Sequence, residues 1–292
     1  MSSAEPEHPV DSANPAFRAR PADAAQAADQ ASGETLSTLQ DAPVEQPLPV
    51  DTSVFDEQTV RLAREIVPRY PGSRSALLPM LHLVQSVQGH ISQAGIVFCA
   101  QQLGLTTAQV SAVVTFYSMY KRKPSGEHLV SVCTNALCAA LGGDEIYARL
   151  GERLGSAEAP LGQEETAGEP GTPGSVTLEH VECLAACDLA PVVQVNYEYF
   201  DKQTVESAIE LVDALRRGER PVPTRGAPLT SWRDTEMQLA GFFGEPEVLQ
   251  AAVDAPSTSE ETMVGARLAE RRGWQAPPMP DDSPLPPVPD KK

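Results

Sequence analysis

The stretch Val176-Thr-Leu-Glu-His-Val-Glu-Cys183-Leu-Ala-Ala-Cys187 is an alternating apolar segment that runs into a pair of cysteines. A second stretch repeats this arrangement, because Leu129-Val-Ser-Val132 leads into Cys133 and another cysteine follows at Cys138. Such segments predict β-strands, so each cysteine pair is expected just beyond the carboxyl end of a strand. If the two strands are neighbours, the two pairs meet at one end of the sheet.

Further strands and helices are expected around these two segments. The pattern predicts a strand over 192–196 and helices over 139–153 and 203–217, with one strand pair forming a hairpin. The Gly- and Pro-rich residues 155–175 are expected to form a loop. This alternation is typical of a compact α/β sandwich, which we assign to residues 124–220.

The preceding residues 55–123 show helical periodicity in four successive runs. Ser92 has the position of a helix N-cap, and Thr106 stands three residues before a glutamine, as in a capping box. Gly89 and Gly104 are expected to end helices. These signals predict a small bundle of four helices ahead of the α/β domain.

The two ends of the chain differ in composition from the middle. Residues 1–54 hold seven prolines and nine acidic residues, and we expect them to be disordered. Residues 221–292 hold twelve of the 27 prolines, which predicts a mostly extended or disordered tail. Apolar and aromatic residues gather within it at 225–245, and this segment is expected either to fold back on its own chain or to dock on a partner.

The charge of the chain excludes some classes of partner. A formal net charge of -18 argues against a nucleic-acid-binding protein and would repel an anionic membrane surface. No stretch approaches the roughly 18 apolar residues of a membrane-spanning helix. The acidic first ten residues do not have the pattern of a secretory signal, so the five cysteines are expected in a reducing compartment, where metal binding is commoner than disulfides.

The two cysteine pairs form a soft set of ligands. Four thiolates suit zinc or an iron–sulfur cluster, and the spacing within each pair is compatible with structural zinc. A two-iron cluster needs two cysteines on each iron, which two separated pairs supply. Spacing alone therefore leaves three interpretations open: a cluster, zinc, and a disulfide or free thiols.

Other titratable residues are expected to have structural or surface roles. Cys99 lies among apolar residues of a predicted helix and is expected to be a buried small side chain. The sequence shows no metal or acid–base partner for four histidines, namely His82, His90, His128 and His180. The run 121–123, Lys-Arg-Lys, is expected to be a solvated turn.

Residues 181–196, Val-Glu-Cys-Leu-Ala-Ala-Cys-Asp-Leu-Ala-Pro-Val-Val-Gln-Val-Asn, resemble the second cysteine loop of the thioredoxin-like 2Fe-2S ferredoxin family. More narrowly, the chain is similar to the E subunits (24-kDa type) of NADH:quinone oxidoreductase, respiratory complex I. The helical half carries the same resemblance in the segments Tyr70-Pro71, Arg74-Ser-Ala-Leu-Leu-Pro79, Gly89-His-Ile-Ser92 and Val113-Val-Thr-Phe-Tyr-Ser118. The resemblance covers about 55–220, with both cysteine pairs at the family's spacing.

The resemblance implies one 2Fe-2S cluster held by Cys133, Cys138, Cys183 and Cys187, and no residue that acts as a catalytic acid, base or nucleophile. It implies a partner flavoprotein subunit that binds NADH and FMN, with further subunits of the peripheral arm. The chain would then carry single electrons without oxidising NADH alone, which agrees with its lack of a G-x-G-x-x-G motif. Such a complex would hold the chain on the cytoplasmic face of the bacterial plasma membrane, without membrane insertion.

The chain departs from the family pattern near both pairs. Ala185 stands where the family usually has glycine, Asp188 where glycine is frequent, and Leu141 where an arginine is common. Glu182 and Asp188 flank the second pair, and neither cysteine loop contains a lysine or arginine. This negative charge predicts a reduction potential near or below the roughly -400 mV of plant-type ferredoxins.

Three alternatives stay open at this point. The chain resembles almost as well the equivalent diaphorase subunit of a soluble NAD-linked hydrogenase or formate dehydrogenase. From a different class, the four thiolates would hold together a zinc-stabilised interaction module. A thiol–disulfide oxidoreductase is the least favoured, because the C-x4-C spacing of the first pair is not the C-x-x-C of thioredoxins.

Overall fold

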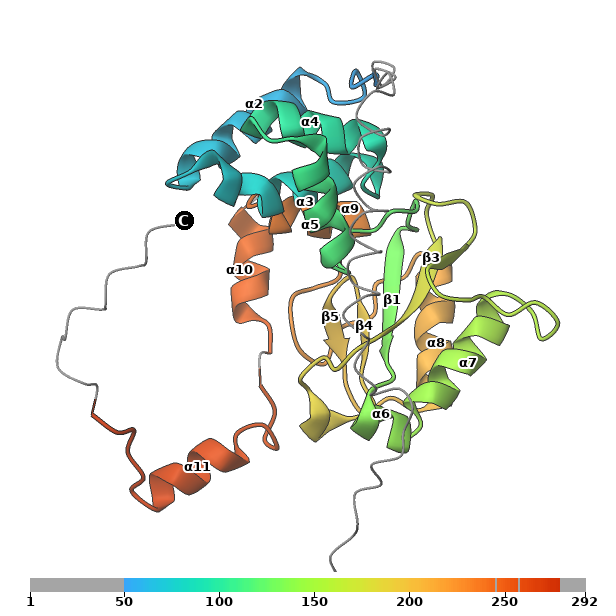
Figure 1. Cartoon of the computed structure of the whole chain (residues 1–292). Helices are drawn as coiled ribbons and strands as arrows, with labels where there is room; N and C mark the ends of the chain where they lie inside the picture. Colours follow the sequence, from blue (N-terminus) through green and yellow to red (C-terminus); the bar gives the residue numbers. More distant parts are fainter. Residues whose placement is uncertain (1–49, 245, 257, 279–292) are drawn as a thin grey trace, which may run out of the picture. The chain divides into compact units, whose positions relative to one another are not determined.

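The computed structural model of the protein describes residues 50–244, 246–256 and 258–278 (Figure 1). Most of the acidic N-terminal extension predicted to be disordered lies outside these residues, as does the proline run 284–289. Helices come first in the chain, a five-stranded sheet with its own helices follows, and three more helices end the described part. The predicted order of helices before a mixed α/β unit is confirmed.

Between residue 50 and the sheet, the structure has four α-helices: α2 (Glu57–Ile66), α3 (Leu77–Gln88), α4 (Gln93–Leu103) and α5 (Thr107–Phe116). Four of their ends are the predicted ones. Ser92 accepts a hydrogen bond from the Gly95 amide, and Thr106 forms a capping box with Gln109. Gly89 and Gly104 end α3 and α4 with left-handed φ angles of 76° and 67°.

The sheet has the strand order β2-β3-β1-β4-β5. Its centre is β1 (His128–Cys133), which pairs in parallel with β3 (Val176–Val181). β4 (Val193–Val195) pairs antiparallel with β1 and forms a hairpin with β5 (Glu198–Phe200). The edge strand β2 (Glu165–Ala167) lies inside the predicted loop 155–175, where three residues among glycines and prolines leave no alternating pattern to detect.

The helix predicted over 139–153 is two helices, α6 (Ala136–Ala140) and α7 (Gly143–Leu154). The break lies at Gly142, whose φ of +107° does not continue a helix. α7 and α8 (Val205–Arg216) contact each other, and their buried residues join those of the sheet in one apolar core. This core supports the ends of β1 and β3, where both cysteine loops begin.

Three helices occupy the region that its prolines predict to be mostly extended: α9 (Trp232–Leu239), α10 (Pro246–Asp254) and α11 (Val264–Arg271). That prediction is wrong for the described part of the region. The helices lie between the prolines, and Pro246 is the first residue of α10, a position where proline's missing N–H is not needed.

Helix α9 folds back onto the N-terminal helices. Trp232 is fully buried, and its indole Nε1 donates to the Gly89 carbonyl oxygen at 3.2 Å. Glu236 is also fully buried and its carboxylate lies 2.6 Å from His82 Nδ1 on α3. The sequence interpretation of His82 as isolated is therefore wrong, because its partner is 154 residues away in the chain. Within 225–245, Leu239 and Phe243 are exposed. Docking of this segment on a partner stays a prediction.

The turn at 121–123 is only partly solvated. Arg122 and Lys123 are exposed, but Lys121 is 4% exposed and its ammonium lies 2.5 Å from the carboxylate of the equally buried Glu179 on β3. Ser131 on β1 donates to the other oxygen of Glu179 at 2.6 Å. The pair therefore joins the end of the helical half to the centre of the sheet.

Within the part of the chain that the structure describes, the helices are too short or too polar to span a membrane.

Candidate metal centre

Both cysteine pairs lie at the same end of the sheet. Cys133 is the last residue of β1 and is paired in register with Val181, the last residue of β3. Cys183 follows two residues later, so parallel pairing brings the two loops side by side. The Thr134 amide donates to the Val181 carbonyl at 3.2 Å and extends this contact past the strands.

Within each pair the two thiols are neighbours. The Sγ atoms of Cys183 and Cys187 are 3.3 Å apart, and Cys133 lies close enough to Cys138 to raise the pKa of its thiol. Cys133 and Cys138 are buried, whereas Cys183 and Cys187 are exposed. One pair therefore lies in the protein and the other faces the surroundings.

The thiols also affect one another's ionisation. Burial raises the pKa of Cys138 to about 11, and the neighbouring Cys133 side chain adds to the effect. The hydrogen bond to Cys183 raises the pKa of Cys187, with burial and the charge of Cys133 as smaller causes. Thiolates gathered in this way repel each other, and a bound cation removes that repulsion by coordinating them.

The second cysteine loop has backbone groups directed at sulfur. The Ala185 amide donates to Cys183 Sγ at 3.4 Å. To reach this position Ala185 takes a φ of +59°, in the left-handed region that favours glycine.

A set of side chains behind the loop was not found by sequence reasoning. The Tyr199 hydroxyl on β5 donates to the carbonyl of Leu184, between the second cysteines, at 3.0 Å. The Arg225 guanidinium stacks on the Tyr199 ring at 4.7 Å and makes two hydrogen bonds of 2.7 Å to the Asp201 carboxylate. Because Arg225 belongs to the Pro-rich C-terminal region, no local motif pointed to this support.

The first cysteine loop is held by its own helix. Asn135 caps α6 by accepting from the Ala136 amide, and its amide group donates to Glu182 in the second loop at 2.5 Å. Gly143, at the start of α7, lies directly under the loop. A Cβ on Gly143 would lie 2.5 Å from the Cys133 carbonyl oxygen and 2.9 Å from that of Cys138. Only glycine fits at this contact.

The remaining candidates do not join this centre. Cys99 is fully buried in the helical half, where burial raises the pKa of its thiol strongly. Among the described residues, no group of three or more Cys, His, Asp or Glu side chains is arranged so that it could hold a metal ion.

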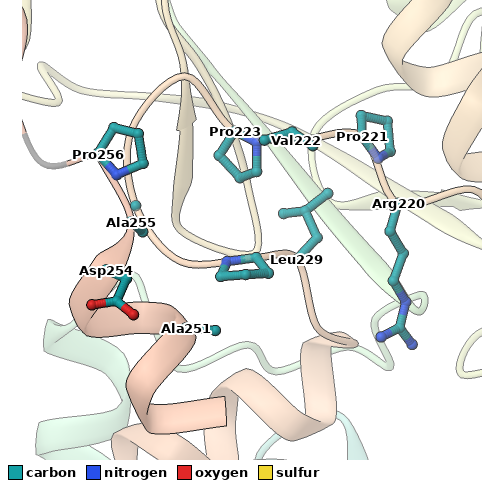
Figure 2. A pocket seen from close by; sticks show the side chains of 11 residues that line it. Arg220, Pro221, Val222, Pro223, Leu229, Ala251, Asp254, Ala255 and Pro256 are labelled. Carbon is teal, nitrogen blue, oxygen red and sulfur yellow. The ribbon is translucent and has the colours of Figure 1, made fainter. Parts of the chain in front are cut away.

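A separate cavity of about 380 Å³ lies between the segment 220–229 and α10 (Figure 2). Its walls are mainly apolar and include Pro221, Pro223, Leu229 and Pro256. Neither cysteine loop contributes to it, so it is not part of the candidate metal centre.

Comparison with known proteins identifies the family. The chain matches the thioredoxin-like [2Fe-2S] ferredoxin family over residues 63–216, a span that contains both cysteine pairs. The chain belongs to this family. The narrower resemblance to the E subunits is confirmed as well, because curated proteins of that name are among its relatives.

The E subunit of NADH-quinone oxidoreductase from Mycobacterium tuberculosis (strain ATCC 25618 / H37Rv) is 53% identical over 219 residues, which are 75% of this chain and 81% of that protein. The protein of the same name from Mycobacterium bovis gives the same values. That of Rickettsia bellii is 34% identical over 165 residues, which are 56% of this chain and 93% of that protein.

Among solved structures, an NAD+-reducing [NiFe]-hydrogenase in the air-oxidized state aligns with 48% of this chain and 23% of its own, at 13% identity and a TM-score of 0.41. A likeness at this level does not help to choose between complex I and a soluble hydrogenase.

Proposed function

We propose that Cys133, Cys138, Cys183 and Cys187 hold one 2Fe-2S cluster and that the chain carries single electrons within NADH-quinone oxidoreductase. One observation carries the proposal: two thiol pairs lie at the ends of adjacent parallel strands in a member of a 2Fe-2S ferredoxin family. Two pairs correspond to two cysteines on each iron. The four thiols therefore have the number and the chemistry that a 2Fe-2S cluster requires. In the described residues, however, they are not yet gathered into one group that could hold a metal ion.

The chain's own residues prepare this site in three ways. A bound metal ion favours the thiolate form of cysteine, and so offsets the burial that raises the pKa of Cys138 and the hydrogen bond to Cys183 that raises the pKa of Cys187. The Ala185 amide donates toward the sulfur of Cys183, and Tyr199 fixes the backbone of the same loop. Hydrogen bonds of this kind position ligands and tune an iron–sulfur centre. When bound, such a cluster supplies one-electron transfer.

The partner that follows from this role is a flavoprotein subunit holding FMN and NADH. A flavin takes two electrons from NADH at once, so a one-electron carrier beside it accepts them separately. As a member of the E-subunit family, the chain is one subunit of the enzyme and is not catalytic alone. We place it on the cytoplasmic face of the bacterial plasma membrane as a peripheral part of the complex. A soluble NAD-linked hydrogenase or formate dehydrogenase module is the alternative host.

The test is chemical analysis of the anaerobically purified full chain, with low-temperature electron paramagnetic resonance (EPR) after dithionite reduction. We expect two irons, two sulfides and one rhombic signal per chain. One tightly held zinc without a signal, persisting after cluster reconstitution, would contradict the proposal and favour the zinc-stabilised module.

Single serine variants of the four cysteines separate ligands from bystanders. Each is expected to lose or alter the EPR signal, whereas Cys99→Ala, at the buried cysteine outside the site, is expected to keep it. Co-purification with quinone-reducing membrane subunits, rather than hydrogenase subunits, identifies the host complex.

A further inference from the structure

The segment 258–278 presents apolar side chains that the rest of the described chain leaves uncovered. None of the residues of α11 is buried. Val264 is 58% exposed and Trp274 is 59% exposed. The guanidinium of Arg272 lies over the Trp274 ring at 5.1 Å, so the indole is held in place at the surface.

This segment is attached to the second cysteine loop. The Thr262 hydroxyl donates to the carboxylate of Asp188, the residue directly after Cys187, at 2.5 Å. Glu261 forms an ion pair with Lys202, just after β5. Two adjacent residues therefore hold the start of α11 beside the exposed cysteines.

The cysteine loops themselves, residues 133–141 and 183–191, carry further apolar surface; we call them the cysteine face. Leu137 and Leu141 on its first loop are 47% and 55% exposed. A cavity of about 360 Å³ opens between the two loops and Lys202, with Leu141 and Pro191 in its wall. The wall of this cavity also contains the polar residues Glu145, Gln203 and Thr204, and Lys202 in the same wall pairs with Glu261 at the anchored end of α11.

The comparisons indicate that the chain shares more than the family domain with some relatives. The alignment with the mycobacterial protein spans 219 residues, which is longer than the family match at 63–216. The alignment with the rickettsial protein spans 165 residues, which are 93% of that protein. Segments outside the family domain are therefore common to this chain and the mycobacterial proteins.

We propose that the segment 258–278 and the cysteine face together form the surface on which the flavoprotein subunit docks. The inference rests on the proposed function, since a partner that exchanges electrons with a cluster at these cysteines must lie against the cysteine face. The same partner then meets α11, which is tied to that face by Asp188 and Lys202. Exposed tryptophan with aliphatic neighbours is the composition that carries binding energy at protein interfaces.

The test uses the full cluster-loaded chain and the purified flavoprotein subunit, because removal of the region from 225 onward would also remove the buried Trp232. Val264→Asp and Trp274→Ala change the proposed surface. Val222→Asp is the matched control, at a side chain that is 85% exposed and outside the surface. The iron content, the sulfide content and the EPR signal of every variant are measured first. The dissociation constant of its complex with the flavoprotein subunit is measured afterwards.

We expect Val264→Asp and Trp274→Ala to weaken binding of the flavoprotein by about tenfold or more, with Val222→Asp and all cluster measurements unchanged. Equal affinities for all four proteins would overturn the docking surface and leave the proposed function intact. If the unmodified, cluster-loaded chain does not bind the flavoprotein, the proposed partner is wrong and the docking surface with it.

A second copy of the chain is the competing occupant. Sedimentation of the unmodified chain alone is expected to show a monomer. A dimer that Val264→Asp dissociates would assign the surface to self-association and would also overturn the proposal.

Discussion

Ala185 shows how one side chain departs from its family without losing the site. Its φ of +59° costs a residue with a Cβ about 1–2 kcal/mol, and glycine, the usual family residue, avoids that cost. The same backbone turn directs the Ala185 amide at Cys183 Sγ. The alanine therefore keeps the hydrogen bond and bears the strain.

We expect Ala185→Gly to raise the midpoint of anaerobic thermal unfolding by a few degrees, because it removes that strain. Ala186→Gly is the matched control: Ala186 has a φ of -110° and is buried, so glycine there loses packing and gains only chain entropy. The control is expected to lower the midpoint. A lower midpoint for Ala185→Gly than for the unmodified chain would show that the turn is not strained.

Gly143 is the other residue on which the site depends. Its missing Cβ leaves room for the carbonyl groups of Cys133 and Cys138, both closer than 3.0 Å to the position a methyl group would take. We expect Gly143→Ala to displace the first cysteine loop at a cost of about 1–3 kcal/mol and to lower the iron and sulfide retained per chain. Gly72→Ala, with no atom within 4 Å of the added methyl group, is expected to retain both. Equal retention in the two variants would contradict this account.

At the scale of elements, α9 connects the two halves of the chain. Trp232 donates through its indole to Gly89 at the end of α3, and its backbone amide donates to Glu127 just before β1. The ring also lies 5.4 Å from that of Tyr197, which follows β4. A helix from the C-terminal region thus completes the core of the N-terminal helices.

We expect Trp232→Ala to lower the free energy of unfolding by about 3–5 kcal/mol, measured by urea denaturation, because it empties a fully buried site. The chain has only one other tryptophan, the exposed Trp274. We expect Trp274→Ala to change the free energy of unfolding by less than about 0.5 kcal/mol. Similar losses in the two variants would mean that α9 is not anchored by Trp232.

At the scale of the whole molecule, Lys121 and Glu179 link the helical half to the sheet through charge. Both side chains are about 95% buried, and the carboxylate receives a second hydrogen bond from Ser131. The backbone amide of Lys121 also donates a hydrogen bond to the side-chain oxygen of Gln85 on α3, at 2.7 Å. The pair therefore joins α3, β1 and β3.

We expect Lys121→Met alone to cost about 3–5 kcal/mol of unfolding free energy, since it leaves a buried carboxylate without its cation. The double variant Lys121→Met with Glu179→Leu is expected to recover most of that loss, as measured by denaturant titration. Arg149→Met, which breaks the exposed pair with Glu152, is expected to cost less than about 1 kcal/mol. Additive costs in the double variant would show that the two charges are not coupled.

The sequence predicted those features that depend on neighbouring residues. Caps at Ser92 and Thr106 and the stops at Gly89 and Gly104 are local, because the groups involved lie within a few residues of each other. The two strands that lead into the cysteines are equally local. Short strands such as β2 and β5 escaped prediction, since three residues carry no periodicity and form strands only when a neighbour supplies hydrogen bonds.

The family, the helical half ahead of a mixed α/β unit and the two cysteine pairs could all be read from the amino-acid sequence, because each is a pattern within a short window. Contacts between groups far apart in the chain became visible in the fold alone. It paired His82 with Glu236 and Lys121 with Glu179, placed Tyr199 behind the second cysteine loop, and tied Thr262 to Asp188. Buried charges and hydroxyls need partners, and the chain finds them wherever the core brings two surfaces together, at separations that no sequence motif records.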